Sequence, residues 1–264
     1  MKKLIFLLFS FIIPITFLCA QETINQTDAN GHKQGRWVNK YANGTIRYEG
    51  SFADNKPVGD WRRFHENGKI KAHLYHIPNT DRATAELFDS NGVRYAKGNY
   101  NGTAKDSTWN YYNNLSLVGK ENFSNGVKNG KSLSFFENGI AATESNWING
   151  FLNGVCRSFY SSGKKKTETM FLQGKRQGLN LIYYESGQTQ ITGQFNNDLS
   201  DGTWKFMGEN GKLKYELKYN AGVLLNPEVV DGIQADEFKA FDRAKGRLKD
   251  PEDFSQSPEE YIRN

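Results

Sequence analysis

The stretch GDWRRFHENGKIKAHLYH, residues 59–76, contains the pattern that decides the fold. Two runs rich in aromatic and aliphatic side chains flank Asn67-Gly68. Asn-Gly between such runs is the strongest short signal for a β-hairpin, because both central residues of a type I′ turn need a positive φ. A two-residue turn here would pair Glu66 with Lys69, so residues 59–76 are predicted to form one hairpin.

The same pattern recurs every 24 residues. Glycines at 35 and 59, and again at 130, 154, 178 and 202, are spaced by this period. Ala83 and Asp106 are expected to fill the equivalent slot in two further units, with one residue deleted between them. Turn dipeptides recur at Asn43-Gly44, Asn67-Gly68, Asn91-Gly92, Asn138-Gly139, Ser162-Gly163, Ser186-Gly187 and Asn210-Gly211. A second turn, around Gly126, Gly150, Gly174 and Gly222, would join consecutive units. We therefore predict an all-β fold: an elongated antiparallel meander of about eight tandem hairpins over residues 35–225.

Aromatic residues follow the repeat when positions are counted from the first residue of each unit as position 0. Position 17 carries a ring in every unit: Phe52, His76, Tyr100, Phe123, Trp147, Phe171, Phe195 and Tyr219. Position 5 carries Phe64, Phe88, Tyr111, Phe135, Phe159 and Tyr183. If Glu66 pairs with Lys69, positions 2, 4, 6, 11, 13, 15 and 17 share one face with Trp37, Trp61 and Trp204. The position-5 rings then form a ladder on the other face, unless a bulge shifts the register and merges them with the core.

The polar residues give no pattern typical of an enzyme or of a metal site. His73 and His76 are expected on opposite faces of one strand, which argues against a shared metal ligand set. Cys156 stands at position 2, where other units have Trp, and this favours a packed side chain over a nucleophile. The glycine-rich loops recur with the repeat, and none has the full Gly-x-x-x-x-Gly-Lys-Ser/Thr motif of a phosphate-binding loop. We predict no catalytic residue, no metal and no cofactor.

The N-terminus predicts export. A basic head with Lys2 and Lys3 precedes a short apolar run, and Ala20 offers a cleavage site, so residues 1–20 are predicted to be a signal peptide and 21–34 a lead-in. Acylation of Cys19 is the alternative. Cleavage leaves Cys156 as the single cysteine and excludes an intramolecular disulfide. It also leaves 32 basic against 29 acidic residues, a charge too small to indicate a nucleic-acid partner.

The motif Tyr48-Glu49-Gly50-Ser51-Phe52 followed by Gly59-Asp60-Trp61 resembles the MORN repeat. The outline recurs at Gly98-Asn99-Tyr100, at Gly193-Gln194-Phe195 and in Gly202-Thr203-Trp204. The longer period and the Glu-Asn-Gly turn are similar to the bacterial variant found in proteins labelled YwqK-family antitoxins. The resemblance implies rows of hairpins in an elongated sheet used for assembly or membrane-proximal attachment, and it brings no catalytic residues. An antitoxin to a cytosolic toxin stays in the cytosol, which disagrees with a signal peptide.

Residues 226–264 leave the repeat and are predicted to form a helical tail or cap. Gln234 to Lys249 is typical of a helix, Pro251 ends it, and Ser257-Pro258 is typical of a second helix start. The tail either covers the open edge of the last hairpin or docks a partner.

The leading hypothesis is an exported, non-enzymatic scaffold of the periplasm, cell envelope or extracellular space that binds a protein or associates with itself. The alternative is a glycan-binding module that uses the position-5 rings Phe64, Phe88, Tyr111, Phe135, Phe159 and Tyr183. An antitoxin-like role, as the resemblance implies, is a further possibility. Membrane contact is possible, but no pattern in the sequence supports it.

Overall fold

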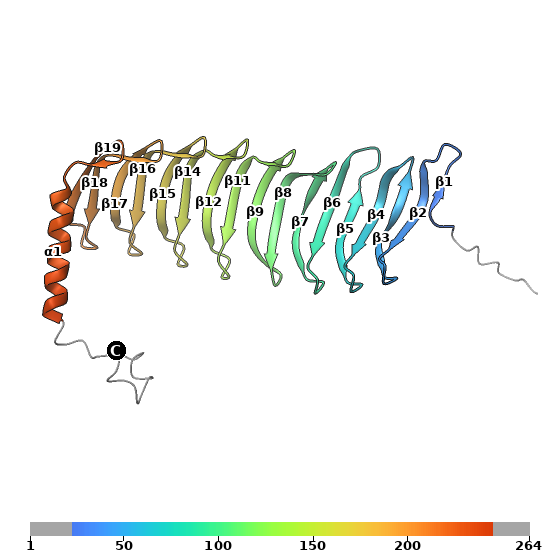
Figure 1. Cartoon of the computed structure of the whole chain (residues 1–264), viewed down its shortest axis with the longest axis horizontal. Helices are drawn as coiled ribbons and strands as arrows, with labels where there is room; N and C mark the ends of the chain where they lie inside the picture. Colours follow the sequence, from blue (N-terminus) through green and yellow to red (C-terminus); the bar gives the residue numbers. More distant parts are fainter. Residues whose placement is uncertain (1–22, 245–264) are drawn as a thin grey trace, which may run out of the picture.

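The structure is a computed structural model that describes residues 23–244. This part of the chain forms one open antiparallel sheet of 20 strands followed by one helix, α1 (Pro227–Ala244) (Figure 1). Each long strand pairs with the next one along the chain, as the predicted meander requires. No described helix is long and apolar enough to cross a membrane. The strands are β1 (Gln26–Thr27), β2 (Lys33–Lys40), β3 (Ile46–Ala53), β4 (Lys56–Phe64), β5 (Ile70–His76), β6 (Arg82–Phe88), β7 (Arg94–Asn101), β8 (Ala104–Asn113), β9 (Ser116–Ser124), β10 (Val127–Lys128), β11 (Gly130–Phe135), β12 (Ala141–Ile148), β13 (Phe151–Leu152), β14 (Gly154–Phe159), β15 (Lys165–Leu172), β16 (Lys175–Tyr183), β17 (Thr189–Asn196), β18 (Leu199–Met207), β19 (Leu213–Asn220) and β20 (Val223–Leu224).

The Asn-Gly turns form hairpins, but the predicted turn type is wrong. At Asn67-Gly68 only the glycine has a positive φ, and the His65 amide bonds to the Lys69 carbonyl across a three-residue loop. This is a type I turn followed by a left-handed glycine. The Asn67 carboxamide explains the preference, because its oxygen accepts from the Lys69 amide and its nitrogen donates to Ser90 of the next repeat.

The type I′ geometry occurs in the turns that join consecutive units. Asn149 and Gly150 have φ values of 50° and 85°, and Asn197 and Asp198 have 50° and 71°. These two-residue turns match the right-handed twist of the strands that they connect.

The third unit boundary also differs from the prediction. Ser107, not Asp106, has the positive φ of 58° that Gly59 (62°) and Gly202 (66°) show at position 0. The one-residue deletion therefore lies later, in the loop Asn114-Leu115, which is a two-residue turn with both φ values positive. Tyr111 consequently sits at position 4, and its neighbour Tyr112 takes position 5.

A β-bulge divides each hairpin near the Asn-Gly turn. Arg63 pairs with Ala72 in the predicted register, whereas Phe64 pairs with Ile70, and Lys71 is the extra residue. Because the bulge is on the returning strand, the position-5 rings stay opposite the tryptophans and do not merge with the core. The face predicted for position 11 is therefore wrong. The side chain at position 11 lies on the same face as the position-5 rings, and the side chain at position 12 lies on the face of the tryptophans instead.

We call the two sides of the sheet the tryptophan face and the opposite face. On the tryptophan face Trp61, Trp109 and Trp204 are buried, each directly over a glycine of the preceding strand, at Gly50, Gly98 and Gly193. A Cβ at any of these glycines would lie 2.1–2.3 Å from an indole carbon. Position-17 rings meet the indoles edge-on, as Phe52, Tyr100 and Phe195 do at 4.8–5.0 Å. In repeats that lack the tryptophan, the glycine that it would cover is replaced by a larger residue. Leu74 faces Ala85, and Thr169 donates a hydrogen bond to Asn180.

Both edges of the sheet are covered by an asparagine side chain. At the first edge the Asn25 carboxamide accepts from the Val38 amide at 2.8 Å and donates to the Val38 carbonyl at 3.1 Å. At the last edge the Asn226 carboxamide accepts from the Lys218 amide at 2.8 Å and donates to the Glu216 carbonyl at 2.9 Å. Each side chain occupies the backbone groups that an added strand would use.

Helix α1 follows directly and packs Val229 and Val230 on the cluster around Trp204. It begins seven residues before the predicted start at Gln234. The predicted Ser257 helix start and the predicted signal peptide lie outside the described residues.

Candidate binding surfaces

The predicted aromatic ladder exists over most of the sheet but is not an open strip. Phe64, Phe88, Phe135, Phe159 and Tyr183 all occupy position 5 on the opposite face. All five side chains are half-buried. The sixth predicted member, Tyr111, is displaced to the tryptophan face by the shifted unit boundary. It packs there against the cluster of Ala85, Ala96 and Trp109.

Charged groups cover the last ring of the ladder. The Tyr183 hydroxyl donates to Glu168 at 2.7 Å, and the Lys165 ammonium lies 5.0 Å from the ring centre. Hydrogen bonds from Lys165, Tyr183 and Arg157 lower the pKa of Glu168 to about 2. Burial, followed by the Glu168 hydrogen bond, raises the pKa of Tyr183. Each polar side chain of this network has a hydrogen-bond partner, and together they cover the edge of the Tyr183 ring.

Tyr111 is equally engaged. Lys105 donates to its hydroxyl at 2.9 Å and lies 4.6 Å above the Trp109 ring. Burial, followed by the hydrogen bond with Glu121, raises the pKa of Tyr111. The structure therefore assigns Tyr111 to the core and away from the predicted ladder.

A second surface on the opposite face is more exposed than the ladder. We call it the outer apolar patch and define it as Ile148, Phe151, Met170, Leu172 and Leu179. Their exposed fractions are 48%, 58%, 42%, 55% and 56%. Val127 and Leu199 extend it on either side and are exposed to a similar degree.

Contacts along the joining turns make the outer apolar patch continuous. Ile148 and Phe151 are a cross-strand pair, and the Phe151 ring lies against Gly174 of the next turn. Leu172 immediately precedes that turn, and Met170 lies two residues earlier on the same face. The Met170 side chain borders Gly178, next to Leu179. Single exposed apolar residues are ordinary on protein surfaces, whereas a contiguous group is typical of an interaction site.

The repeats that carry this patch have a small or polar residue in place of the buried tryptophan on the other face. Ser132, Cys156 and Asn180 occupy position 2 in these units. Ser132 Oγ is buried without a hydrogen-bond partner in the described part of the chain. These repeats therefore lack the buried indole of the repeats around Trp61, Trp109 and Trp204.

The sequence reasoning missed the outer apolar patch because it followed only the rings. The sequence feature that indicates this patch is the apolar residue at each of positions 1, 16 and 18, namely Leu179, Met170 and Leu172. The same positions of the second unit hold Asp60, Tyr75 and Ile77, with one charged residue among the three.

The histidines lie as predicted on two faces. His73 contacts Asp60 at 2.9 Å on the opposite face, whereas the His76 ring lies edge-on to Trp61 on the tryptophan face. Burial lowers the pKa of His76. The Cys156 thiol is half-buried, and burial raises its pKa, which keeps it protonated and weakly nucleophilic near neutral pH.

Three groups near the first edge could present metal ligands. Atoms of Asp28, His32 and Asp54 lie within 4.8 Å of one another. Asp28 Oδ1 already accepts from the Asn30 and His32 amides, and the Gln34 carboxamide donates to both carboxylates. These hydrogen bonds explain why the three side chains lie together, because they hold closed the turn that follows β1.

The geometry defines a class of protein: a single-layer repeat array in which each hairpin packs only on its neighbours and which presents two long faces. Five of its segments match the MORN repeat variant family, at residues 33–54, 57–77, 152–173, 176–197 and 200–221. The unmatched stretch between them contains the short Asn114-Leu115 loop. A comparison with curated proteins found no match.

Proposed function

We propose that this chain is an exported, non-enzymatic repeat scaffold that binds a protein partner through the outer apolar patch. MORN repeats occur in repeat scaffolds with binding roles, and this supports the general class. The observation that carries the specific proposal is the exposure of five contiguous apolar side chains, four of them about half exposed or more. The export part of the proposal rests on Lys2, Lys3 and the apolar run that follows them.

A face contact fits this sheet better than strand addition. The Asn25 and Asn226 carboxamides occupy backbone groups at the two edges. Large apolar residues are typical anchors of protein interfaces, where they fill pockets of the partner and exclude water. Phe151 and Leu179 are the expected anchors, and the neighbouring Lys175 is the expected polar rim.

The experiment is capture from an extract of the native cell envelope, comparing the natural chain with Phe151→Ser/Leu179→Ser. The natural chain is expected to retain a defined protein that the double variant loses. Tyr75→Ser is the matched control, because Tyr75 is also exposed on the opposite face but lies far from the patch. Equal capture by all three chains would refute the assignment of the patch. Self-association of the natural chain that the double variant loses would identify a second copy as the partner.

A further inference from the structure

The tryptophan face of the last repeats is cationic and aromatic. Between residues 130 and 219, all of which the structure describes, the positions that the register places on this face contain no carboxylate. Their charged side chains are Lys166, Arg176 and Lys214, of which Arg176 is already paired with the Asp198 carboxylate of a joining turn at 3.1 Å. Lys166 lies 5.6 Å from the Tyr160 ring centre, and Arg176 lies 3.9 Å from that of Phe195. The opposite face differs, because its cations alternate with Glu144, Glu168 and Glu216.

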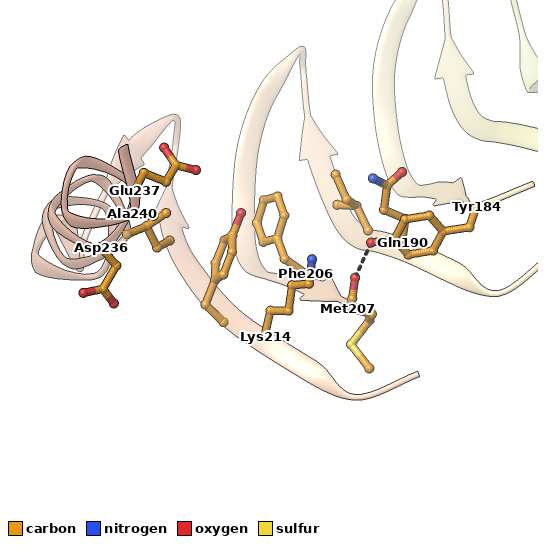
Figure 2. Close-up of a pocket in the computed structure, with 11 residues that line it drawn as sticks. Tyr184, Gln190, Phe206, Met207, Lys214, Asp236, Glu237 and Ala240 are labelled. Carbon is orange, nitrogen blue, oxygen red and sulfur yellow. Dashed lines mark hydrogen bonds between the residues drawn. The ribbon is translucent and has the colours of Figure 1, made fainter. Parts of the chain in front are cut away.

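Helix α1 brings acidic groups to this surface without closing it. Its first turn packs on the sheet, but Phe238, farther along, is 65% exposed. A cavity of about 520 Å³ remains between the helix and the sheet (Figure 2). Asp236 and Glu237 line it from the helix, and Lys214 and Tyr184 line it from the sheet.

The sequence that follows α1 has the negative charge that the strands of this surface lack. Residues 250–264 contain five carboxylates and two rings, Phe254 and Tyr261, against a single base, Arg263. Fifteen extended residues span up to about 50 Å, whereas two repeats, the separation of Lys214 and Lys166, span about 20 Å. The segment is therefore long enough to cross both lysines.

We propose that residues 250–264 bind in cis along the tryptophan face, from the cavity beside α1 toward Lys166. The carboxylates pair with Lys214 and Lys166, and the rings lie beside Tyr184 and Tyr160. This contact uses the face opposite the outer apolar patch, so it is independent of the proposed partner site.

The test uses the full chain and a zero-length carboxyl-to-amine cross-linker, with equal parts of isotopically labelled and unlabelled protein. The expected products join Lys166 or Lys214 to carboxylates of 250–264 within one molecule, with a yield independent of protein concentration. Cross-links equally distributed over Lys205 and Lys131 of the opposite face would overturn the proposal. Products that join labelled to unlabelled chains would overturn binding in cis and indicate a second copy.

Charge reversal provides the second measurement. Hydrogen exchange of the amides in 250–264 is expected to accelerate about tenfold in Lys166→Glu/Lys214→Glu, because attraction becomes repulsion. Adding Glu259→Lys and Glu260→Lys should restore the slower exchange. The control is Lys205→Glu, which reverses a charge on the opposite face, where Lys205 contacts Glu216 at 3.6 Å. Equal exchange in the natural chain and the double variant would refute the contact.

Discussion

Gly98 is the position where the packing of this sheet can be tested most directly. A Cβ at residue 98 would lie 2.3 Å from Trp109 Cδ2 and 2.5 Å from Cε2, whereas ordinary contacts begin near 3.4 Å. The Trp109 ring is fully buried, so it must move by about 1 Å against its neighbours or leave the slot. Gly98→Ala is therefore expected to destabilise the chain although alanine suits a strand better than glycine.

The expected size follows from two opposing effects. Overpacking of a closed core costs about 1–3 kcal/mol. Alanine loses less backbone entropy than glycine on folding, and this offsets about 0.5–1 kcal/mol of that cost. The net loss should be about 1–2 kcal/mol, and full expulsion of the ring would raise it toward the roughly 3–5 kcal/mol of a Trp→Ala change.

The assay is urea unfolding followed by far-ultraviolet circular dichroism, with the m-value checked for each variant. Gly119→Ala is the control, because a Cβ there meets its nearest atom at 3.6 Å and φ is not positive. It is expected to leave the chain unchanged or slightly more stable. In a Trp109→Ala background, Gly98→Ala should lose its cost. The same cost with and without the indole ring would refute the explanation by steric contact.

Three further predictions concern other parts of the chain. Asn226→Ala removes two edge hydrogen bonds, to Glu216 and Lys218, and is expected to cost about 1–2 kcal/mol and to produce concentration-dependent association, measured by ultracentrifugation; a monomer of unchanged stability would contradict it. Glu168 has a depressed pKa of about 2, so its contribution to stability is present above about pH 4.5 and disappears as pH falls toward 2. The stability difference between the natural chain and Glu168→Gln should accordingly shrink over that range, and a constant difference would exclude the linkage. The Cys156 thiol, whose pKa is raised by burial, should react with a disulfide reagent at pH 8 more slowly in the folded chain than in urea, and equal rates would show that it is open to solvent.

The sequence predicted the hairpins well because their turn chemistry is local. Asn67-Gly68 specifies a reversal of the chain wherever it occurs between two apolar runs. The turn type was wrong because it depends on the next repeat: the Asn67 amide nitrogen donates to the Ser90 carbonyl, a bond that no isolated hairpin can make. The bulge at Lys71 follows from the same loop, and it reassigned positions 11 and 12.

The unit boundary at Ser107 could have been found from the sequence. Trp61 follows Gly50 by 11 residues, and Trp109 follows Gly98 by the same interval. The indole requires that glycine, so the Gly-Trp pair marks the frame of the repeat better than a glycine at position 0 does. In this unit neither candidate for position 0, Asp106 or Ser107, is a glycine. With this marker Tyr111 falls at position 4, in the core, and leaves the predicted binding ladder.

The distribution of apolar residues between the two faces supports a binding role for the middle of the sheet. Burial at position 2 stabilises the repeats around Trp61, Trp109 and Trp204, and fully burying a large side chain contributes roughly 1.5–3 kcal/mol. The repeats of Cys156 and Asn180 lack that contribution, yet they place large apolar side chains on the opposite face, where more than 40% of each remains in water. An exposed Leu179 or Phe151 adds little to the stability of the isolated sheet. The arrangement becomes favourable only when a second surface removes these side chains from water, which is what the proposed partner would do.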